Sequence, residues 1–271
     1  MSVEPDQEPP QGAGKGRPAP TDGEARRPKP AASKKADEDP DAVLTHADTP
    51  VPSLDELRAA MQWAFEAEDV ASGLLDRFAE HAERVLRGNR LMNLTAIVDP
   101  KEVAAKHYLD SWRATRLLPL MGRRLVDLGT GAGFPGIPVA LAEAQARITC
   151  IDSNKKRAQF VQECIAAMGI ANADTSDERA EEHLARNPCD IVLIRAVSSA
   201  RENVRTLRKV KHAQKDVMML KGKSWSREVR AAEREAERLG FRLDTVWEHE
   251  LPDEMGKRAI LVYRAPGGQG I

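Results

Sequence analysis

Four glycines stand within eight residues of the segment 125–138, directly after a run of apolar residues. Because glycine has no Cβ, a backbone that contains it turns sharply and comes close to a flat or anionic ligand. The segment is typical of a buried strand, a glycine-rich turn and the start of a helix, which is how α/β proteins bind nucleotides. Three interpretations are open: an NAD site, an S-adenosylmethionine site, or a tight turn that binds nothing.

Two nucleotide-binding patterns overlap in this segment. Residues 131–136 match the dinucleotide pattern G-x-G-x-x-G. Residues 127–133 match the pattern acidic-x-Gly-x-Gly-x-Gly that usually binds S-adenosylmethionine. Asp127 favours the second pattern, since its carboxylate can meet the ammonium of a methionine moiety, directly or through water. Pro135 and Pro138 also favour it, because each lacks an N–H group that a pyrophosphate would need.

Asp152 ends the next apolar run, nineteen residues after Gly133. An acidic residue at about this place accepts hydrogen bonds from the ribose hydroxyls of NAD and of S-adenosylmethionine alike. The alternative is that Asp152 caps the helix predicted from Lys155. The matching strand and turn favour ribose binding, and therefore a ligand that contains adenosine.

Strand and helix patterns alternate from residue 124 onward. Strands are predicted at 124–128, 146–151, 174–178, 190–194 and 217–220, and helices at 137–143, 155–168, 201–211 and 226–239. This alternation predicts an α/β fold with a parallel sheet and helices on both faces. Two last strands, at 241–248 and 258–263, have no helix between them, which predicts one antiparallel strand at the edge.

We predict three parts along the chain. Residues 1–50 hold nine of the 17 prolines and no aromatic residue, so we expect a disordered tail. Residues 51–120 read as a helical extension, which opens with a capping box at Ser53 and Glu56. A third helix of this extension is predicted from Pro100 to about Leu118. Residues 121–265 form the α/β domain.

Composition excludes several classes of protein. Residues 51–271 carry 34 basic and 32 acidic side chains, so net charge alone does not indicate a nucleic-acid partner. The tail has no apolar core of a secretory signal, and no segment is long enough to span a membrane, so we expect a cytoplasmic protein. The three cysteines lack metal-ligand spacing, and we expect no metal site.

Seven short blocks resemble those of one known family, the bacterial small-subunit ribosomal RNA guanine-N7 methyltransferases, also called glucose-inhibited division protein B. The blocks are residues 92–95, 107–111, 127–138, 151–153, 179–182, 194–196 and 220–222. Asn-Leu-Thr at 93–95 and His-Tyr-Leu-Asp-Ser at 107–111, ahead of the glycines, make the match specific. The resemblance covers residues 54–264. The chain departs from the family in its tail and at 87–92, where an aromatic residue is often found.

The resemblance implies a class I S-adenosylmethionine-dependent methyltransferase, with a Rossmann-like sheet and an N-terminal helical extension. The implied reaction is methyl transfer to N7 of a guanosine in the 530 loop of 16S rRNA. The cofactor would be S-adenosylmethionine and the partner the small ribosomal subunit; we expect a monomer. The expected cofactor-binding residues are Asp127, Gly129, Gly131, Phe134, Asp152, Ala180, Glu181 and Arg195.

Guanine N7 carries a lone pair and no proton, so its methylation needs no general base. Residues 194–197 agree with this, since they hold neither the Asn/Asp-Pro-Pro-aromatic motif of amine methylation nor the Pro-Cys pair of pyrimidine C5 transfer. We therefore expect catalysis by positioning and no certain catalytic residue. Arg195 would hold the cofactor or donate to guanine O6; otherwise it merely ends a strand.

Basic residues near the carboxyl ends of the strands are candidates for RNA phosphate contacts: Lys221, Lys223 and Arg258. His107 and Asp110 lie one helical turn apart, which predicts a helix-face hydrogen bond or a pocket wall rather than a catalytic pair. Two other functions stay open. One is an NAD-dependent oxidoreductase, from residues 131–136, and the other is a non-catalytic RNA-binding module.

Overall fold

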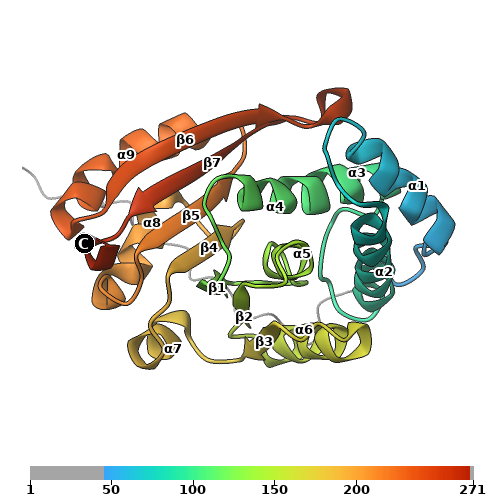
Figure 1. The fold of residues 1–271 in the computed structure, drawn as a ribbon, viewed down its shortest axis with the longest axis horizontal. Helices are drawn as coiled ribbons and strands as arrows, with labels where there is room; N and C mark the ends of the chain where they lie inside the picture. The colour runs from blue at the N-terminus through green and yellow to red at the C-terminus, as the bar shows by residue number, and fades with distance from the viewer. Residues whose placement is uncertain (1–45, 269–271) are drawn as a thin grey trace, which may run out of the picture. The chain divides into compact units, whose positions relative to one another are not determined.

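A sheet of seven strands, in the order β3-β2-β1-β4-β5-β7-β6, organises the computed structural model of this chain (Figure 1). The structure describes residues 46–268, so the predicted tail 1–50 lies outside the described residues apart from its last five. The strands are β1 (Arg124–Leu128), β2 (Arg147–Ile151), β3 (Ala173–Ser176), β4 (Ile191–Arg195), β5 (Asp216–Lys221), β6 (Arg242–Glu250) and β7 (Lys257–Arg264).

The sheet is mostly parallel. The first five strands run parallel to their neighbours, whereas β7 pairs antiparallel with both β5 and β6. The predicted fold, with one antiparallel strand at this edge, is confirmed; the antiparallel strand is β7, and β6 lies outside it. β4 and β5 are buried along nearly their whole length, which explains their continuous apolar sequence.

Helices cover both faces of the sheet. They are α5 (Gly136–Ala142), α6 (Lys155–Met168), α7 (Ala180–Arg186), α8 (Ala200–Thr206) and α9 (Trp225–Leu239). Alternate residues of the central strands point to opposite faces. Leu125 and Leu193 join the core under α5 and α6, whereas Val126 and Val192 join the core under α7, α8 and α9.

The N-terminal helices pack on the α5 and α6 side of the sheet (Figure 1). They are α1 (Leu54–Ala64), α2 (Ser72–Asn89), α3 (Pro100–Val103) and α4 (Asp110–Arg113). The predicted third helix is interrupted, because a π-helical segment, Ala104–Leu109, joins α3 to α4. Such π-helical segments occur often at functional sites. Within residues 46–268, no helix is both long and apolar enough to cross a bilayer.

Candidate functional site

The carboxyl ends of β1, β2 and β4 meet at one edge of the sheet, and the predicted site residues come directly after or at these ends. The glycine turn connects β1 to α5, Asp152 follows β2, and Arg195 ends β4. Open α/β sheets bind ligands in the crevice outside these ends, where the order of the strands reverses. Here the reversal lies between β1 and β4.

The glycines of the turn have different tasks. Gly129, Gly131 and Gly133 have φ angles of 72°, 59° and 99°, which other residues rarely adopt. A Cβ on Gly129 would lie 2.7 Å from Val197 Cγ2, and one on Gly133 would lie 2.7 Å from Ile137 Cγ1. A Cβ on Gly131 would have no atom within 4 Å. Gly131 therefore borders open space where a ligand can approach, whereas the other two are needed for packing.

Asp127 lies fully buried beneath the turn. Its Oδ2 accepts hydrogen bonds from Thr130 Oγ1 at 2.5 Å and from the Gly136 N–H at 2.8 Å. Its Oδ1 is buried and has no partner among residues 46–268. Burial raises the pKa of this carboxyl to about 6, although the two hydrogen bonds oppose the shift. The carboxylate therefore stabilises the turn through Oδ2, and its Oδ1 remains able to accept from a cation or another hydrogen-bond donor.

Asp152 links the turn to the end of β2. Its Oδ2 accepts from the Gly131 N–H at 3.0 Å, and its Oδ1 accepts from the Asn154 N–H at 2.9 Å. The cap of α6 is Asn154, whose side chain accepts from two N–H groups of the first turn. The alternative interpretation, in which Asp152 caps the helix, is therefore wrong.

Arg195 is tied to the π-helical segment. Its Nη1 donates to the Lys106 carbonyl at 2.9 Å, and its Nη2 lies 3.1 Å from His107 Nδ1. The guanidinium also lies over the Phe134 ring, 4.9 Å from its centroid. Burial lowers the pKa of this arginine from its ordinary value. The side chain thus joins the end of β4 to the N-terminal helices across the glycine turn.

Phe134 is enclosed by rings from those helices. His107 stacks on it at 4.7 Å between centroids, while Tyr108 and His81 meet its ring edge to face at 5.1 and 5.4 Å. The Tyr108 hydroxyl lies 2.9 Å from His81 Nδ1. Burial lowers the pKa of His81 to about 3 and holds that of His107 well below its usual range, so both rings are neutral near pH 7.

His107 and Asp110 each have partners of their own. His107 Nε2 lies 2.9 Å from Thr95 Oγ1, and because Nδ1 faces an arginine donor, Nε2 carries the proton. Asp110 Oδ1 lies 3.3 Å from His249 Nε2 on β6. The predicted helix-face bond between the two residues is therefore not formed, and each side chain connects the π-helical region to a different part of the molecule.

Asn89 holds the 92–95 block in place, which sequence reasoning missed. Its Oδ1 accepts from the N–H groups of Leu94 and Thr95, and its Nδ2 donates to the Thr95 carbonyl. A buried asparagine after a glycine reads only as a turn signal. His81 was missed as well, since a lone histidine on an apolar helix face gives no functional signal. Blocks 92–95, 107–111 and 194–196 thus meet around Phe134.

A family model described as rRNA small subunit methyltransferase G matches residues 75–254. The chain belongs to this family. Two relatives, each named ribosomal RNA small subunit methyltransferase G, are 36% and 35% identical to it. The first, from Solibacter usitatus, aligns over 69% of this chain and 88% of its own length. The second, from Symbiobacterium thermophilum, aligns over 68% and 79%.

A solved O-methyltransferase from Bacillus cereus has a similar fold, with a TM-score of 0.52 at 13% identity. The match covers 78% of this chain and all of the other. At this identity the similarity concerns the fold alone, and it agrees with the class I methyltransferase architecture. The family resemblance of the seven sequence blocks is confirmed by the family match.

The other predicted site residues of this family member lie around the same sheet edge or beyond β3. Ala180 begins α7 after β3 and is buried, and Glu181 beside it is half-buried. Lys223 is exposed, and Arg258 on β7 lies with its Nε 4.0 Å from Asp110 Oδ2.

Lys221 differs from its prediction. Its side chain is 7% exposed, 2.9 Å from Glu228 Oε2, and its Nζ donates to the Ser198 carbonyl at 2.5 Å. A buried ammonium that is already paired cannot also hold an RNA phosphate at the surface. The placement therefore disfavours the predicted RNA contact and makes Lys221 a support for the loop after β4.

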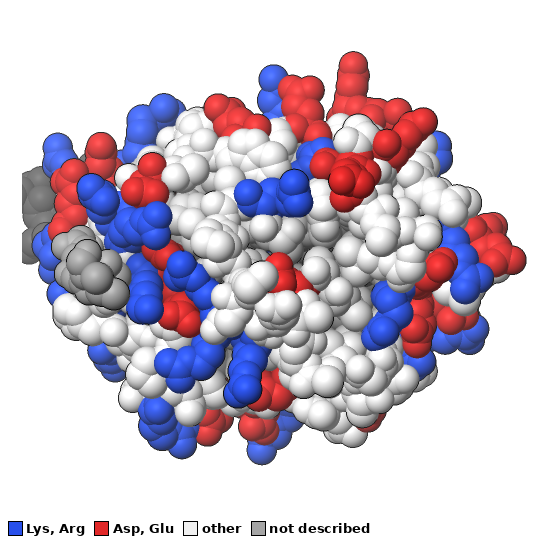
Figure 2. Space-filling view, viewed as in Figure 1, with Lys and Arg blue, Asp and Glu red and all other residues white. Residues whose placement is uncertain are grey.

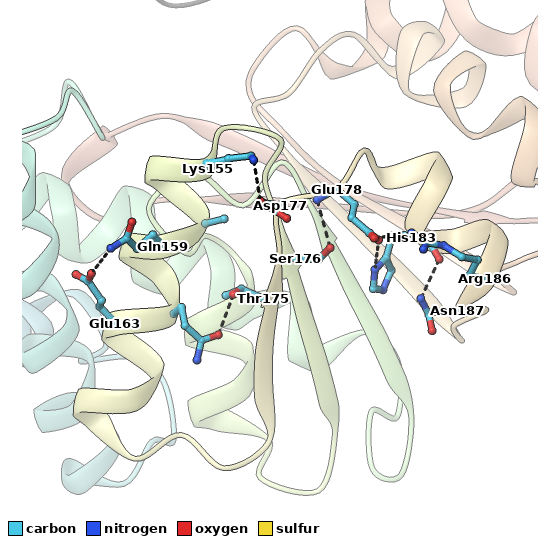
Figure 3. Close-up of a pocket in the computed structure, with 12 residues that line it drawn as sticks. Lys155, Gln159, Glu163, Thr175, Ser176, Asp177, Glu178, His183, Arg186 and Asn187 are labelled. Carbon is cyan, nitrogen blue, oxygen red and sulfur yellow. Dashed lines mark hydrogen bonds and ion pairs between the residues drawn. The ribbon is translucent and has the colours of Figure 1, made fainter. Parts of the chain in front are cut away.

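A polar groove of about 840 Å³ lies between α6 and α7, beside the edge strand β3 (Figure 3). Glu178 pairs there with His183 at 3.4 Å and with Arg186 at 2.5 Å. Neither the glycine turn nor Arg195 lines this groove.

Figure 2 shows Lys and Arg side chains gathered over the α7 and α8 side of the view, with acidic side chains between them.

Proposed function

We propose that this protein transfers a methyl group from S-adenosylmethionine to N7 of a guanosine in the 530 loop of 16S rRNA. The observation that carries the proposal is the match of residues 75–254 to a family named for rRNA methylation, because it includes both the glycine turn and the three rings that enclose Phe134. Family membership leaves the NAD-dependent oxidoreductase without support beyond the overlap of two glycine patterns.

The residues present suit this cofactor. The unpartnered Asp127 Oδ1 can accept from the ammonium of its methionine moiety, and the open space at Gly131 leaves room for the ligand backbone. Asp152 keeps carboxylate lone pairs for the ribose hydroxyls, since each oxygen accepts one backbone N–H. Ala180 and Glu181 remain the candidates for contact with adenine.

Bound S-adenosylmethionine would supply an electrophilic methyl group, whose bond to sulfur breaks as the bond to guanine N7 forms. The positive charge passes to the methylated base and no proton leaves, so the chain needs no general base. The two buried histidines beside the turn agree with this, since both are neutral and engaged with protein partners. The task of the residues is to position the acceptor.

Arg195 would act as a positioning residue in this reaction. Two of its donors are used on Lys106 and His107. It would hold the π-helical segment against Phe134, which leaves fewer of its N–H groups to bind the cofactor. Lys223 and Arg258 remain the candidates for RNA phosphate contacts, and we infer that the enzyme acts as a monomer on the small subunit in the cytoplasm.

The test is transfer of labelled methyl groups to small ribosomal subunits and to naked 16S rRNA from a strain that lacks the modification. We expect 7-methylguanosine in the nuclease fragment that contains the 530 loop, identified by mass spectrometry. Label on an exocyclic amine or in another fragment would contradict the assignment. RNA binding without transfer, at saturating S-adenosylmethionine, would instead support the non-catalytic module.

A further inference from the structure

The loop that follows β4 contains a strained residue at the candidate site. Ala196 has a φ angle of 55°, in the left-handed region that residues with a Cβ adopt at a cost. It comes directly after Arg195, which ends β4, and it is exposed. Strain of this kind persists only where the surroundings impose it, and it is common at functional sites.

Both ends of this loop are held by side chains from other elements. On one side, Arg195 is bound to the π-helical segment. On the other side, the Ser198 carbonyl accepts from Lys221, and the Ser198 hydroxyl donates to Asn203 Oδ1 at 2.5 Å. Ser199 then caps α8. The conformation of Ala196 is therefore imposed from both directions.

The imposed conformation of Ala196 fixes the position of Val197, the next residue. Its Cγ2 lies 2.7 Å from the position that a Cβ on Gly129 would take, which is too close for a residue larger than glycine to fit there. Gly129 begins the turn with a φ angle of 72°, and its own N–H donates to the Ile151 carbonyl. A branched apolar side chain from the end of β4 thus packs on the first glycine of a turn whose next glycine, Gly131, borders open space.

We propose that Val197 is a positioning residue for methyl transfer, which holds the Gly129 turn in its binding conformation and is itself held there by strained Ala196 and buried Lys221. The inference rests on the proposed function, because it gives the turn a cofactor to bind. It also explains why the family block 220–222 carries a lysine that is not at the surface.

The first test compares Val197→Ala with Val204→Ala by calorimetry with S-adenosylmethionine and S-adenosylhomocysteine. Val204 is a matched control, since it is buried in α8 in the core on the same side of the sheet. Both variants lose the same two methyl groups and should melt at a lower temperature. Only Val197→Ala should bind both ligands more weakly, by roughly tenfold.

The second test is Ala196→Gly, which relieves the left-handed strain. We expect a melting temperature equal to or above that of the unchanged protein, with kcat lower by roughly ten- to a hundredfold, because Val197 is no longer held in one place. If the loop had only a structural role, Ala196→Gly would change the melting temperature and kcat in the same direction, or would leave kcat unchanged.

Two results would overturn the inference: cofactor affinity in Val197→Ala equal to that in Val204→Ala, or full turnover in Ala196→Gly. Failure of the proposed function looks different. In that case the unchanged protein itself would bind neither ligand, or would bind them and leave 16S rRNA unmethylated, and no comparison among the variants would be needed to see it.

Discussion

At the scale of a single residue, we expect Asp127 to make S-adenosylmethionine binding sensitive to pH. Its folded-state pKa of about 6 lies above the ordinary value of 3.8, so without a ligand the carboxyl is largely protonated below pH 6. An ammonium on Oδ1 favours the ionised form. We expect binding of S-adenosylmethionine to release a proton, and affinity to rise as the pH is raised from 5 to 7 and then level off.

The measurement is calorimetry across this pH range in buffers of different ionisation enthalpy, with Asp127→Asn as the comparison. A profile equally steep in Asp127→Asn would contradict the assignment.

The raised pKa of Asp127 also makes the stability of the fold depend on pH. Because the folded pKa is raised, the contribution of Asp127 is fully present below pH 3.8 and is lost as the pH rises through about 6. The free energy of unfolding, relative to Asp127→Asn, should therefore fall over this window.

Substitutions of Lys221 and Lys223 should distinguish a structural lysine from one that binds RNA. Lys223 is exposed, whereas Lys221 is buried against Glu228. We expect Lys223→Gln to weaken RNA binding and to reduce the slope of log affinity against log salt by about one. Lys221→Gln should leave that slope unchanged and lower the melting temperature. A reduced slope in Lys221→Gln would restore it as a phosphate contact.

At the scale of elements, the π-helical segment connects the N-terminal helices to the glycine turn. The Tyr108 hydroxyl in this segment bonds to buried His81 of α2. We expect Tyr108→Phe to lower the free energy of unfolding by about 1 to 3 kcal/mol, because the histidine nitrogen is left buried without its partner. Tyr263→Phe on β7 is the control, since Tyr263 is buried in the other core. Equal losses in denaturant titrations of the two variants would contradict this coupling.

At the scale of the whole molecule, the N-terminal helices and the sheet share one core. Leu57 and Phe78 of the helices belong to the same apolar cluster as Leu125 and Ile148 of the sheet. We therefore expect the two parts to unfold together. Fluorescence from Trp63 and Trp112 in the helices and from Trp225 and Trp247 in the α/β part should report one midpoint in urea, measured in variants that keep one pair each. Two separate midpoints would show that the helices form an independent unit.

The sequence by itself determined the α/β alternation and the glycine turn, and it predicted the class of ligand for that turn. These features depend on local chemistry: a positive φ angle selects glycine, a strand buried on both faces selects a continuous apolar run, and Asp127 lies at the end of that run. The family blocks added the prediction that the methyl acceptor is an rRNA guanosine. Their order along the chain does not show that three of them meet around Phe134.

Only the tertiary structure decided the contacts of Lys221, Asn89, His81 and Val197. Lys221 looked like a surface cation because its burial against Glu228 depends on how α9 packs on β5. Val197 and Gly129 are distant in sequence and meet only because β1 and β4 are neighbours in the sheet. Contacts of this kind join segments that the chain order separates, so no local pattern of residues records them.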